Sequence, residues 1–250
     1  MIRDVFEKRF VISGHRGYCA KYPENTLLSF QAAIELGVDM LELDLHLSAD
    51  GVIMLMHDAT LDRTTNGHGP LRAKTCAQLK ELDAGGWKAS YYEGLKIPTF
   101  EEFLTLTRPH ENLLFSVEIK EEPDDIACAD AAIALTGTYG MTERCVFTSF
   151  NAAVTDHIHD RYALPNLGYW DKYMRNVQPC SIAKLWSVGV PMQDVSREHM
   201  AMWRARDIWP CAFCADTAEQ VIQCLESDAA MVTCNDPVPA LRITRERGLR

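Results

Sequence analysis

Histidine and carboxylate side chains cluster near the start of the chain in four short motifs. These are His15-Arg16-Gly17, Pro23-Glu24-Asn25-Thr26, Glu42-Leu43-Asp44 and His57-Asp58. Two histidines can divide proton transfer between them, because one can deprotonate a nucleophile while the other protonates the departing alkoxide. Paired carboxylates are ligands that a hard divalent cation prefers. Together these groups are suited to hydrolysing a phosphate ester with the help of a metal ion.

The carboxylates of Glu42 and Asp44 alternate with leucines along the stretch 41–47 and share a face with His46. In a barrel strand the leucines would face the helices and the acids the interior, where a cation is their natural partner. The competing interpretation is an amphipathic strand with a solvated acidic face. That interpretation fits an antiparallel edge strand better than a barrel strand.

A third acid, Glu118, lies toward the end of another apolar run, 113–120, with Lys120 on the same face. Three oxygen ligands, completed by water or phosphate oxygens, suit Mg²⁺ or Ca²⁺ better than zinc. A structural salt bridge between Glu118 and Lys120 is the competing interpretation.

His15 ends the first predicted strand, so His15 and Arg16 should lie at the same barrel mouth as the three acids. Arg16 can bind phosphate oxygens through two parallel hydrogen bonds, and Lys120 can add a point charge. His15 and His57 are therefore the candidate acid and base. We interpret the other histidines as surface or supporting groups: His46, His68, His110, His157, His159 and His199.

Apolar runs and helical periodicities alternate along the chain, as in a parallel sheet wrapped by helices. Eight strands are predicted at 10–14, 40–45, 113–119, 144–148, 167–170, 187–191, 208–213 and 230–233. Capping residues precede several helices: Asn25 or Thr26, Thr99 and Thr217. The pattern predicts a (β/α)8 TIM barrel. A doubly wound open sheet is the alternative, but no glycine-rich nucleotide fingerprint follows a strand.

One segment does not fit the eightfold count. Asp50-Gly51 predicts a turn, and the apolar run 52–56 after it predicts a strand that folds back as a hairpin. The stretch 59–97 is rich in Gly, Thr and charge and is long for a barrel loop. We expect a small subdomain inserted after the second strand, at about 46–98, within a single domain that spans 1–250.

Composition narrows the class of partner. The formal net charge of −10 argues against nucleic acid, so a small phosphodiester substrate is expected.

No apolar run reaches the roughly 18 residues of a membrane span, and the N-terminus lacks a secretory signal, so we expect a cytoplasmic protein. Nine cysteines, an odd count, are expected to be reduced. Cys211 and Cys214 have redox or metal spacing, but we interpret them as small buried residues.

The motifs follow one another in a specific order. They are His15-Arg16-Gly17, Pro23-Glu24-Asn25-Thr26, Glu42-Leu43-Asp44, Asp50-Gly51, His57-Asp58 and Leu61-Asp62-Arg63-Thr64-Thr65, followed later by Val117-Glu118-Ile119-Lys120. In this order and spacing the chain resembles the glycerophosphodiester phosphodiesterase family, whose members have a barrel like that of the PI-PLC phosphodiesterases. The match is contiguous over about the first seventy residues and thins after Lys120.

The resemblance implies a barrel with an inserted subdomain after its second strand. It also implies hydrolysis of glycerophosphodiesters, such as glycerophosphocholine or glycerophosphoethanolamine, to glycerol 3-phosphate and an alcohol. By the same resemblance the glycerol hydroxyl attacks first, giving a cyclic phosphate that water opens. The implied roles are acid and base for His15 and His57, in either order; Mg²⁺ or Ca²⁺ ligands for Glu42, Asp44 and Glu118; and phosphate contacts for Arg16 and Lys120.

The second half departs from the family pattern in two places. Phe213-Cys214-Ala215-Asp216 stands where relatives often carry a Trp-Thr-Val-Asn-like element. Thr233-Cys234-Asn235-Asp236-Pro237 replaces the commoner Thr-Asp-x-Pro. We expect neither change to touch a proposed catalytic group, and therefore expect the changes to affect the choice of alcohol and not the chemistry.

Three alternative functions use the same residues differently. A lysophospholipase D-type enzyme would act on an acylated glycerol. It would require an apolar channel for the acyl chain or an apolar surface that faces a membrane. A non-catalytic, metal-dependent binding protein would keep the acids and could lose a histidine. A thiol-redox protein built on Cys211 and Cys214 would require a reactive, acidified thiol.

Overall fold

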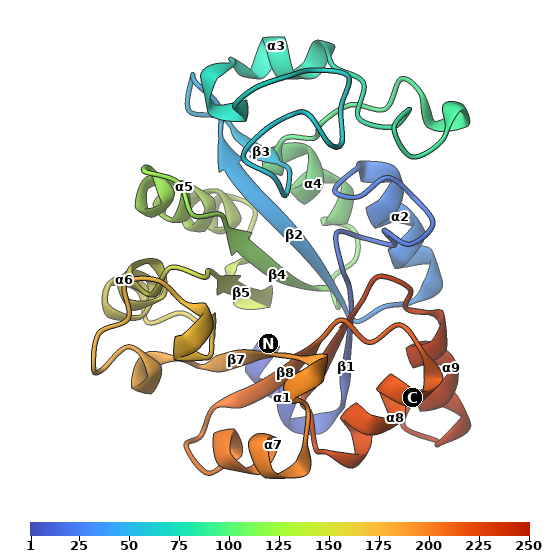
Figure 1. The fold of residues 1–250 in the computed structure, drawn as a ribbon, viewed down its shortest axis with the longest axis vertical. Coiled ribbons are helices and arrows are strands. Elements are labelled where there is room, and N and C mark those ends of the chain that lie inside the picture. The colour runs from blue at the N-terminus through green and yellow to red at the C-terminus, as the bar shows by residue number, and fades with distance from the viewer.

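Eight parallel strands close into a barrel in the computed structural model, which describes residues 1–250 (Figure 1). The strands are β1 (Val11–Gly14), β2 (Met40–Leu47), β4 (Leu114–Ile119), β5 (Cys145–Thr148), β6 (Asn166–Tyr169), β7 (Ser187–Pro191), β8 (Trp209–Phe213) and β9 (Met231–Cys234). Closure occurs at β1, which pairs with β2 on one side and with β9 on the other. The prediction of a (β/α)8 barrel is confirmed.

Helices and short 3₁₀ turns connect the strands. The α-helices are α1 (Ile2–Lys8), α2 (Leu27–Leu36), α3 (Cys76–Glu81), α4 (Phe100–Thr107), α5 (Asp125–Thr138), α6 (Ala152–Tyr162), α7 (Arg197–Arg204), α8 (Ala218–Glu226) and α9 (Val238–Glu246). The 3₁₀ turns are Leu71–Ala73, Ser90–Tyr92, Thr142–Arg144, Asp171–Tyr173, Ile182–Lys184 and Met192–Asp194. None of the helices is both long enough and apolar enough to cross a bilayer.

The predicted helix starts agree with the structure. The Thr26 side chain accepts a hydrogen bond from the Ser29 backbone N–H, which caps α2. Thr99 and Thr217 each form a reciprocal capping box, with Glu102 and Gln220 respectively. Each box satisfies two backbone donors that the helix itself leaves without partners.

The two faces of the strands bury different sets of side chains. Leu41, Leu43 and Leu45 of β2 belong to the large apolar cluster that also contains helix residues. Met40 instead belongs to a second cluster with residues of the other strands and with Ile2 and Phe6 of α1. Because α1 packs where the strands begin, that end of the barrel is filled with apolar groups. The polar side chains collect at the opposite end, where the strands finish.

The segment after β2 departs from the barrel pattern. β3 (Ile53–Leu55) pairs antiparallel with the end of β2, and Gly51 takes the positive φ of 79° that the connecting turn requires. The chain then forms a small apolar cluster of its own: Met54, Met56, Leu61, Leu71, Leu79, Ala84 and Ile97. In Figure 1 this segment, which contains α3, lies beyond the arrowhead of β2. It therefore covers part of the end of the barrel that carries the polar groups.

Replacing Phe103 by Ala should lower the free energy of unfolding by about 3–5 kcal/mol, the usual cost of deleting a buried phenyl ring. The fully buried Phe103 ring on α4 lies 4.8 Å from the Phe30 ring and 5.4 Å from the Phe115 ring, so its loss opens a cavity between two helices and the sheet. Urea unfolding measures the change. As a control, Thr105→Ala at an exposed position of the same helix should change the free energy of unfolding by no more than about 0.5 kcal/mol. Equal effects of the two variants would refute this account of the core.

Candidate active site

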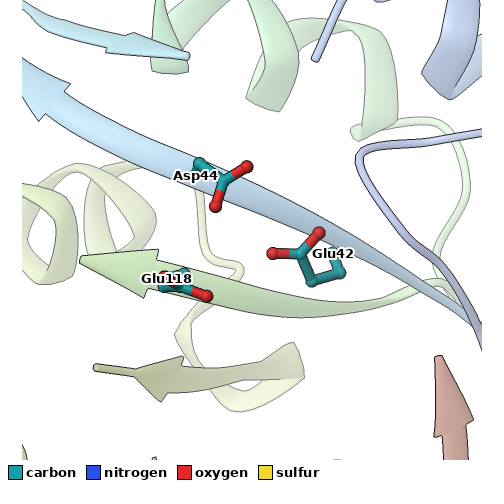
Figure 2. Close-up of side chains that lie close together, drawn as sticks. All are labelled: Glu42, Asp44 and Glu118. Carbon is teal, nitrogen blue, oxygen red and sulfur yellow. The ribbon is translucent and has the colours of Figure 1, made fainter. Parts of the chain in front are cut away.

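Three carboxylates gather at the carboxyl end of β2 and β4. Asp44 stands directly opposite Glu118 in the parallel register, and Glu42 lies two residues earlier on β2. One oxygen atom from each carboxylate lies within 4.8 Å of those of the other two (Figure 2). The three residues are only 6, 1 and 8% exposed, for Glu42, Asp44 and Glu118 respectively. The structure therefore brings together the three acids that the sequence singled out.

Two cationic side chains lie against this cluster. Lys120 Nζ lies 2.9 Å from Asp44 Oδ1 and 2.5 Å from Glu118 Oε1. Arg16 Nε lies 3.2 Å from Asp44 Oδ2. The salt bridge between Glu118 and Lys120 thus exists, but it is part of a wider network and does not replace the acidic cluster. Whether Arg16 and Lys120 contact phosphate stays a prediction.

The carboxylates ionise unequally. Burial favours the neutral acid, but the charges of Lys120 and Arg16 outweigh it and hold the pKa of Asp44 well below its usual range. Burial, together with the charges of Asp44 and Glu118, raises the pKa of Glu42 well above its usual range. Three ionised carboxylates would carry one negative charge more than Lys120 and Arg16 neutralise, and the raised pKa of Glu42 reflects that excess.

The donor set fits a hard divalent cation. All three ligands are carboxylate oxygens, which suit Mg²⁺ or Ca²⁺ better than a metal that prefers nitrogen or sulfur. A cation would also relieve the repulsion that raises the pKa of Glu42. The three carboxylates thus form an acidic site with the donor atoms that a hard divalent cation requires.

His15 directly follows β1, and its ring lies between the acidic cluster and the last strand. Nε2 lies 3.8 Å from Glu42 Oε2, and Nδ1 lies 2.7 Å from Asn235 Oδ1. Burial, helped by the neighbouring Arg16 charge, lowers the pKa of His15 to about 4. The imidazole is therefore neutral at physiological pH.

The turn after His15 positions Arg16. Arg16 and Gly17 both have positive φ, 51° and 87°, and the Arg16 N–H donates to Glu42 Oε2 at 2.9 Å. A Cβ at position 17 would come within 2.4 Å of Ser29 Oγ, so only glycine allows α2 to approach this closely. The close approach of α2 therefore explains why Gly17 stands in the first motif.

His57 lies after β3, and its Nδ1 is 2.6 Å from Asp58 Oδ1. Asp58 is in turn held by the Arg63 guanidinium through two hydrogen bonds of 2.7 and 2.9 Å. The same guanidinium binds Glu24 through two hydrogen bonds of 2.8 Å, and Glu24 also accepts from Arg16. A chain of ion pairs therefore links His57 to the loop that carries Arg16.

A second group of residues supports these side chains. Asn25 Nδ2 donates to Asp44 Oδ2 at 2.7 Å, and His46 Nε2 lies 3.3 Å from the His57 carbonyl oxygen. The interpretation of His46 as a supporting group therefore agrees with its position. Asn25 and Arg63 were part of matched motifs, but the sequence alone gave no reason to assign them these contacts.

Two hollows open onto the acidic cluster and share Glu118. The deeper one is lined by His15 and Glu42 together with aromatic residues that include Tyr169. The shallower one is lined by His57 and Lys120, among others. The two candidate proton-transfer histidines therefore reach the same group of carboxylates from different hollows.

The aromatic wall of the deeper hollow depends on a glycine. The Tyr169 ring stacks on Phe150 with centroids 3.5 Å apart, and it meets the Phe213 ring edge-on. A Cβ at Gly189 would come within 2.4 Å of the Tyr169 ring, so a larger residue there would displace it. Tyr169 was not singled out from the sequence, because its strand carries no motif.

The expectation for the two departures from the family pattern is wrong. Asn235 lies in the second of these segments, and its hydrogen bond to His15 shows that the segment touches a proposed catalytic group. Cys214 of the first segment places its sulfur 3.7 Å from His15 Nδ1. A usable signal was the strand order, because the segments after β8 and β9 must lie beside the end of β1 in a closed barrel.

The cysteines do not form an activated pair. Cys211 is buried within β8, as expected, whereas Cys214 is only partly buried. Burial raises the pKa of both thiols, which is the opposite of what a redox centre requires. The thiol-redox interpretation therefore has no support here.

A family model described as the glycerophosphoryl diester phosphodiesterase family matches residues 15–206. This chain belongs to that family. It is 35% identical over 173 residues to a glycerophosphodiester phosphodiesterase of Bacillus subtilis. The alignment covers 64% of this chain and 58% of the relative. It is 37% identical over 145 residues to one of Caldanaerobacter subterraneus subsp. tengcongensis, covering 56% of this chain and 58% of the relative. The chain therefore spans under two thirds of the length of each relative.

A solved structure shares the fold over nearly the full length. A phosphodiesterase from Oleispira antarctica, in complex with the product sn-glycerol-3-phosphate, superposes with a TM-score of 0.85 at 21% identity. The match covers 97% of this chain and 99% of that chain. At this identity the comparison confirms the barrel fold of the family.

Binding of Mg²⁺ or Ca²⁺ should release protons, because Glu42 must ionise to become a ligand. The affinity for metal should be greatest when the pH lies above the raised pKa of Glu42. It should fall as the pH is lowered through that pKa, because protons then compete with the metal. Calorimetric titrations at about pH 5.5 and about pH 7.5, each in two buffers with different heats of ionisation, count the protons released.

The Glu42→Gln variant is the matched control for this experiment. It should bind metal more weakly and without the proton release, because its side chain has the same shape and cannot ionise. Heats that do not depend on the buffer at either pH in the unaltered protein would contradict a titrating ligand at position 42.

Proposed function

We propose that this protein is a metal-dependent glycerophosphodiester phosphodiesterase. It would hydrolyse glycerophosphodiesters, such as glycerophosphocholine or glycerophosphoethanolamine, to glycerol 3-phosphate and an alcohol. The observation that carries the proposal is the buried triad of Glu42, Asp44 and Glu118 with His15 beside it, in a chain that belongs to this family. The product bound to the Oleispira antarctica phosphodiesterase supports this substrate class. We assign the activity to one domain, 1–250, with the insertion at about 46–98.

The acidic cluster would hold the cation, and the two cationic side chains would hold the substrate. Glu42, Asp44 and Glu118 supply the oxygen ligands that Mg²⁺ or Ca²⁺ requires. When bound, the cation would neutralise charge on the phosphate oxygens and favour attack at phosphorus. Arg16 and Lys120 already lie at the edge of the cluster, so a phosphate bound there would meet both positive charges.

The two histidines would act as general base and general acid. One accepts the proton of the attacking hydroxyl as its oxygen bonds to phosphorus, and the other donates a proton to the departing alkoxide. If the hydroxyl of the glycerol attacks first, the product is a cyclic phosphate, and water then opens it with the two roles reversed. His15 and His57 are suited to these roles because each holds its Nδ1 in a hydrogen bond, which leaves Nε2 available for proton transfer.

The reaction class can be tested with protein stripped of metal by a chelator. Incubation with glycerophosphocholine should release glycerol 3-phosphate only after Mg²⁺ or Ca²⁺ is added, as measured by an enzyme-coupled assay. Glycerophosphoethanolamine and lysophosphatidylcholine complete the panel. Preference for the lysolipid would favour a lysophospholipase D-type activity, and metal binding without turnover of any substrate would favour a binding protein.

Replacing His15 or His57 by Ala should lower kcat by at least about a hundredfold, the usual contribution of a general acid or base. The melting temperature should change little, because neither side chain belongs to an apolar cluster. His159→Ala, on the exposed face of α6, is the control and should keep full activity. Near-normal turnover in the His15 or His57 variant would remove that histidine from the mechanism.

A further inference from the structure

A hydrogen-bonded relay runs from His15 to a carboxylate that lies outside the acidic cluster. Asn235 Oδ1 lies 2.7 Å from His15 Nδ1, and Asn235 Nδ2 donates to Asp216 Oδ2 at 2.7 Å. Asp216 Oδ1 accepts from the backbone N–H groups of Asn235 and Asp236 at 2.6 and 3.0 Å. The Asp216 carboxylate is thus held by three donors, two of them backbone groups that cannot rotate away.

The chemistry of each group fixes the direction of every hydrogen bond in the relay. An ionised carboxylate can only accept, so the Asn235 side chain must turn its NH₂ group toward Asp216. Its amide oxygen then faces His15 and can only accept as well. The hydrogen between them must therefore belong to His15 Nδ1.

A neutral imidazole has one N–H, so a hydrogen on Nδ1 leaves the lone pair on Nε2. Nε2 is the nitrogen that faces the acidic cluster, 3.8 Å from Glu42 Oε2. The relay therefore presents an acceptor nitrogen, and not an N–H donor, to the place where phosphate would bind.

We propose that Asp216, acting through Asn235, holds His15 in the tautomer protonated at Nδ1 and so makes Nε2 the proton acceptor of the site. Asp216 and Asn235 are then positioning residues, since neither touches the acidic cluster. The inference rests on the proposed phosphodiesterase function, and it assigns the general base to His15 and the general acid to His57. During attack, one proton passes from the hydroxyl to Nε2 and one passes from His57 to the leaving alkoxide, so the number of protons on the enzyme is unchanged.

The carboxylate and the amide of the relay can exchange places without loss of a hydrogen bond. With Asp216→Asn and Asn235→Asp together, the new amide oxygen would accept from the two backbone donors and its NH₂ would donate to the new carboxylate. That carboxylate would still accept from His15 Nδ1. An exchange of both therefore preserves every hydrogen bond of the relay, whereas a change of only one does not.

Three variants test the relay: Asp216→Asn, Asn235→Asp and the two combined. In Asp216→Asn the new amide keeps its oxygen on the backbone donors and turns its NH₂ toward Asn235, whose own amide must then flip. His15 Nδ1 would face an NH₂ group and become the acceptor, so kcat should fall more than tenfold with KM nearly unchanged. Asn235→Asp sets two carboxylates side by side and should also lose activity. The combined variant should recover to within about threefold of the unaltered enzyme.

The tautomer itself can be observed without measuring activity. Long-range ¹H–¹⁵N correlation spectra of the metal-free protein should show the hydrogen on Nδ1 of His15, and on Nε2 in Asp216→Asn. Glu219→Gln is the matched control, because this carboxylate is exposed on the first turn of α8 and makes no hydrogen bond with Asp216, Asn235 or His15. It should leave the spectrum and kcat unchanged. A hydrogen on Nε2 in the unaltered protein, or a combined variant as impaired as the single ones, would overturn the proposal. Absence of activity with the predicted tautomer would instead refute only the proposed function.

Discussion

Burial of three carboxylates within one small space is the constraint on which the rest of the site depends. Glu42, Asp44 and Glu118 lie on adjacent strands of a closed barrel, so bulk water cannot screen their repulsion. The surrounding residues are arranged to compensate. Arg16 and Lys120 supply positive charge, and Asn25 supplies a donor to Asp44. The compensation is incomplete at Glu42, and that is where a divalent cation would contribute most.

A chain of ion pairs holds the inserted segment over the barrel and links it to the acidic cluster. Arg63 lies in that segment and binds Glu24 in the loop after β1 and Asp58 beside His57. Glu24 in turn helps to orient Arg16 toward Asp44. The position of His57 is therefore coupled to the acidic cluster through charged side chains and not only through the backbone of the β2–β3 hairpin. A shift of the insertion would move His57 and Arg16 together.

The sequence predicted what local patterns determine. Alternation of leucines and acids placed Glu42 and Asp44 on the inner face of β2, and capping residues placed the starts of α2, α4 and α8. It did not predict contacts made only when the barrel closes. His15 and Asn235 are 220 residues apart, and they meet because β1 pairs with β9. The resemblance thins over this second half. The two departures from the family pattern were therefore expected to affect only alcohol specificity, although Asn235 in one of them contacts His15.

Closure of the barrel therefore does more than bury apolar side chains. It brings β1, which His15 directly follows, beside β9 and next to β8, and the segments after these two strands carry Asn235 and Asp216. Residues from opposite ends of the chain therefore determine which nitrogen of one imidazole bears hydrogen. His57 receives its partner from the adjacent residue and needs no such closure. The two histidines thus depend on different parts of the fold: His57 on the insertion and its Arg63 contacts, His15 on the last two strands. A perturbation of either part should disturb one proton transfer and leave the other histidine correctly oriented.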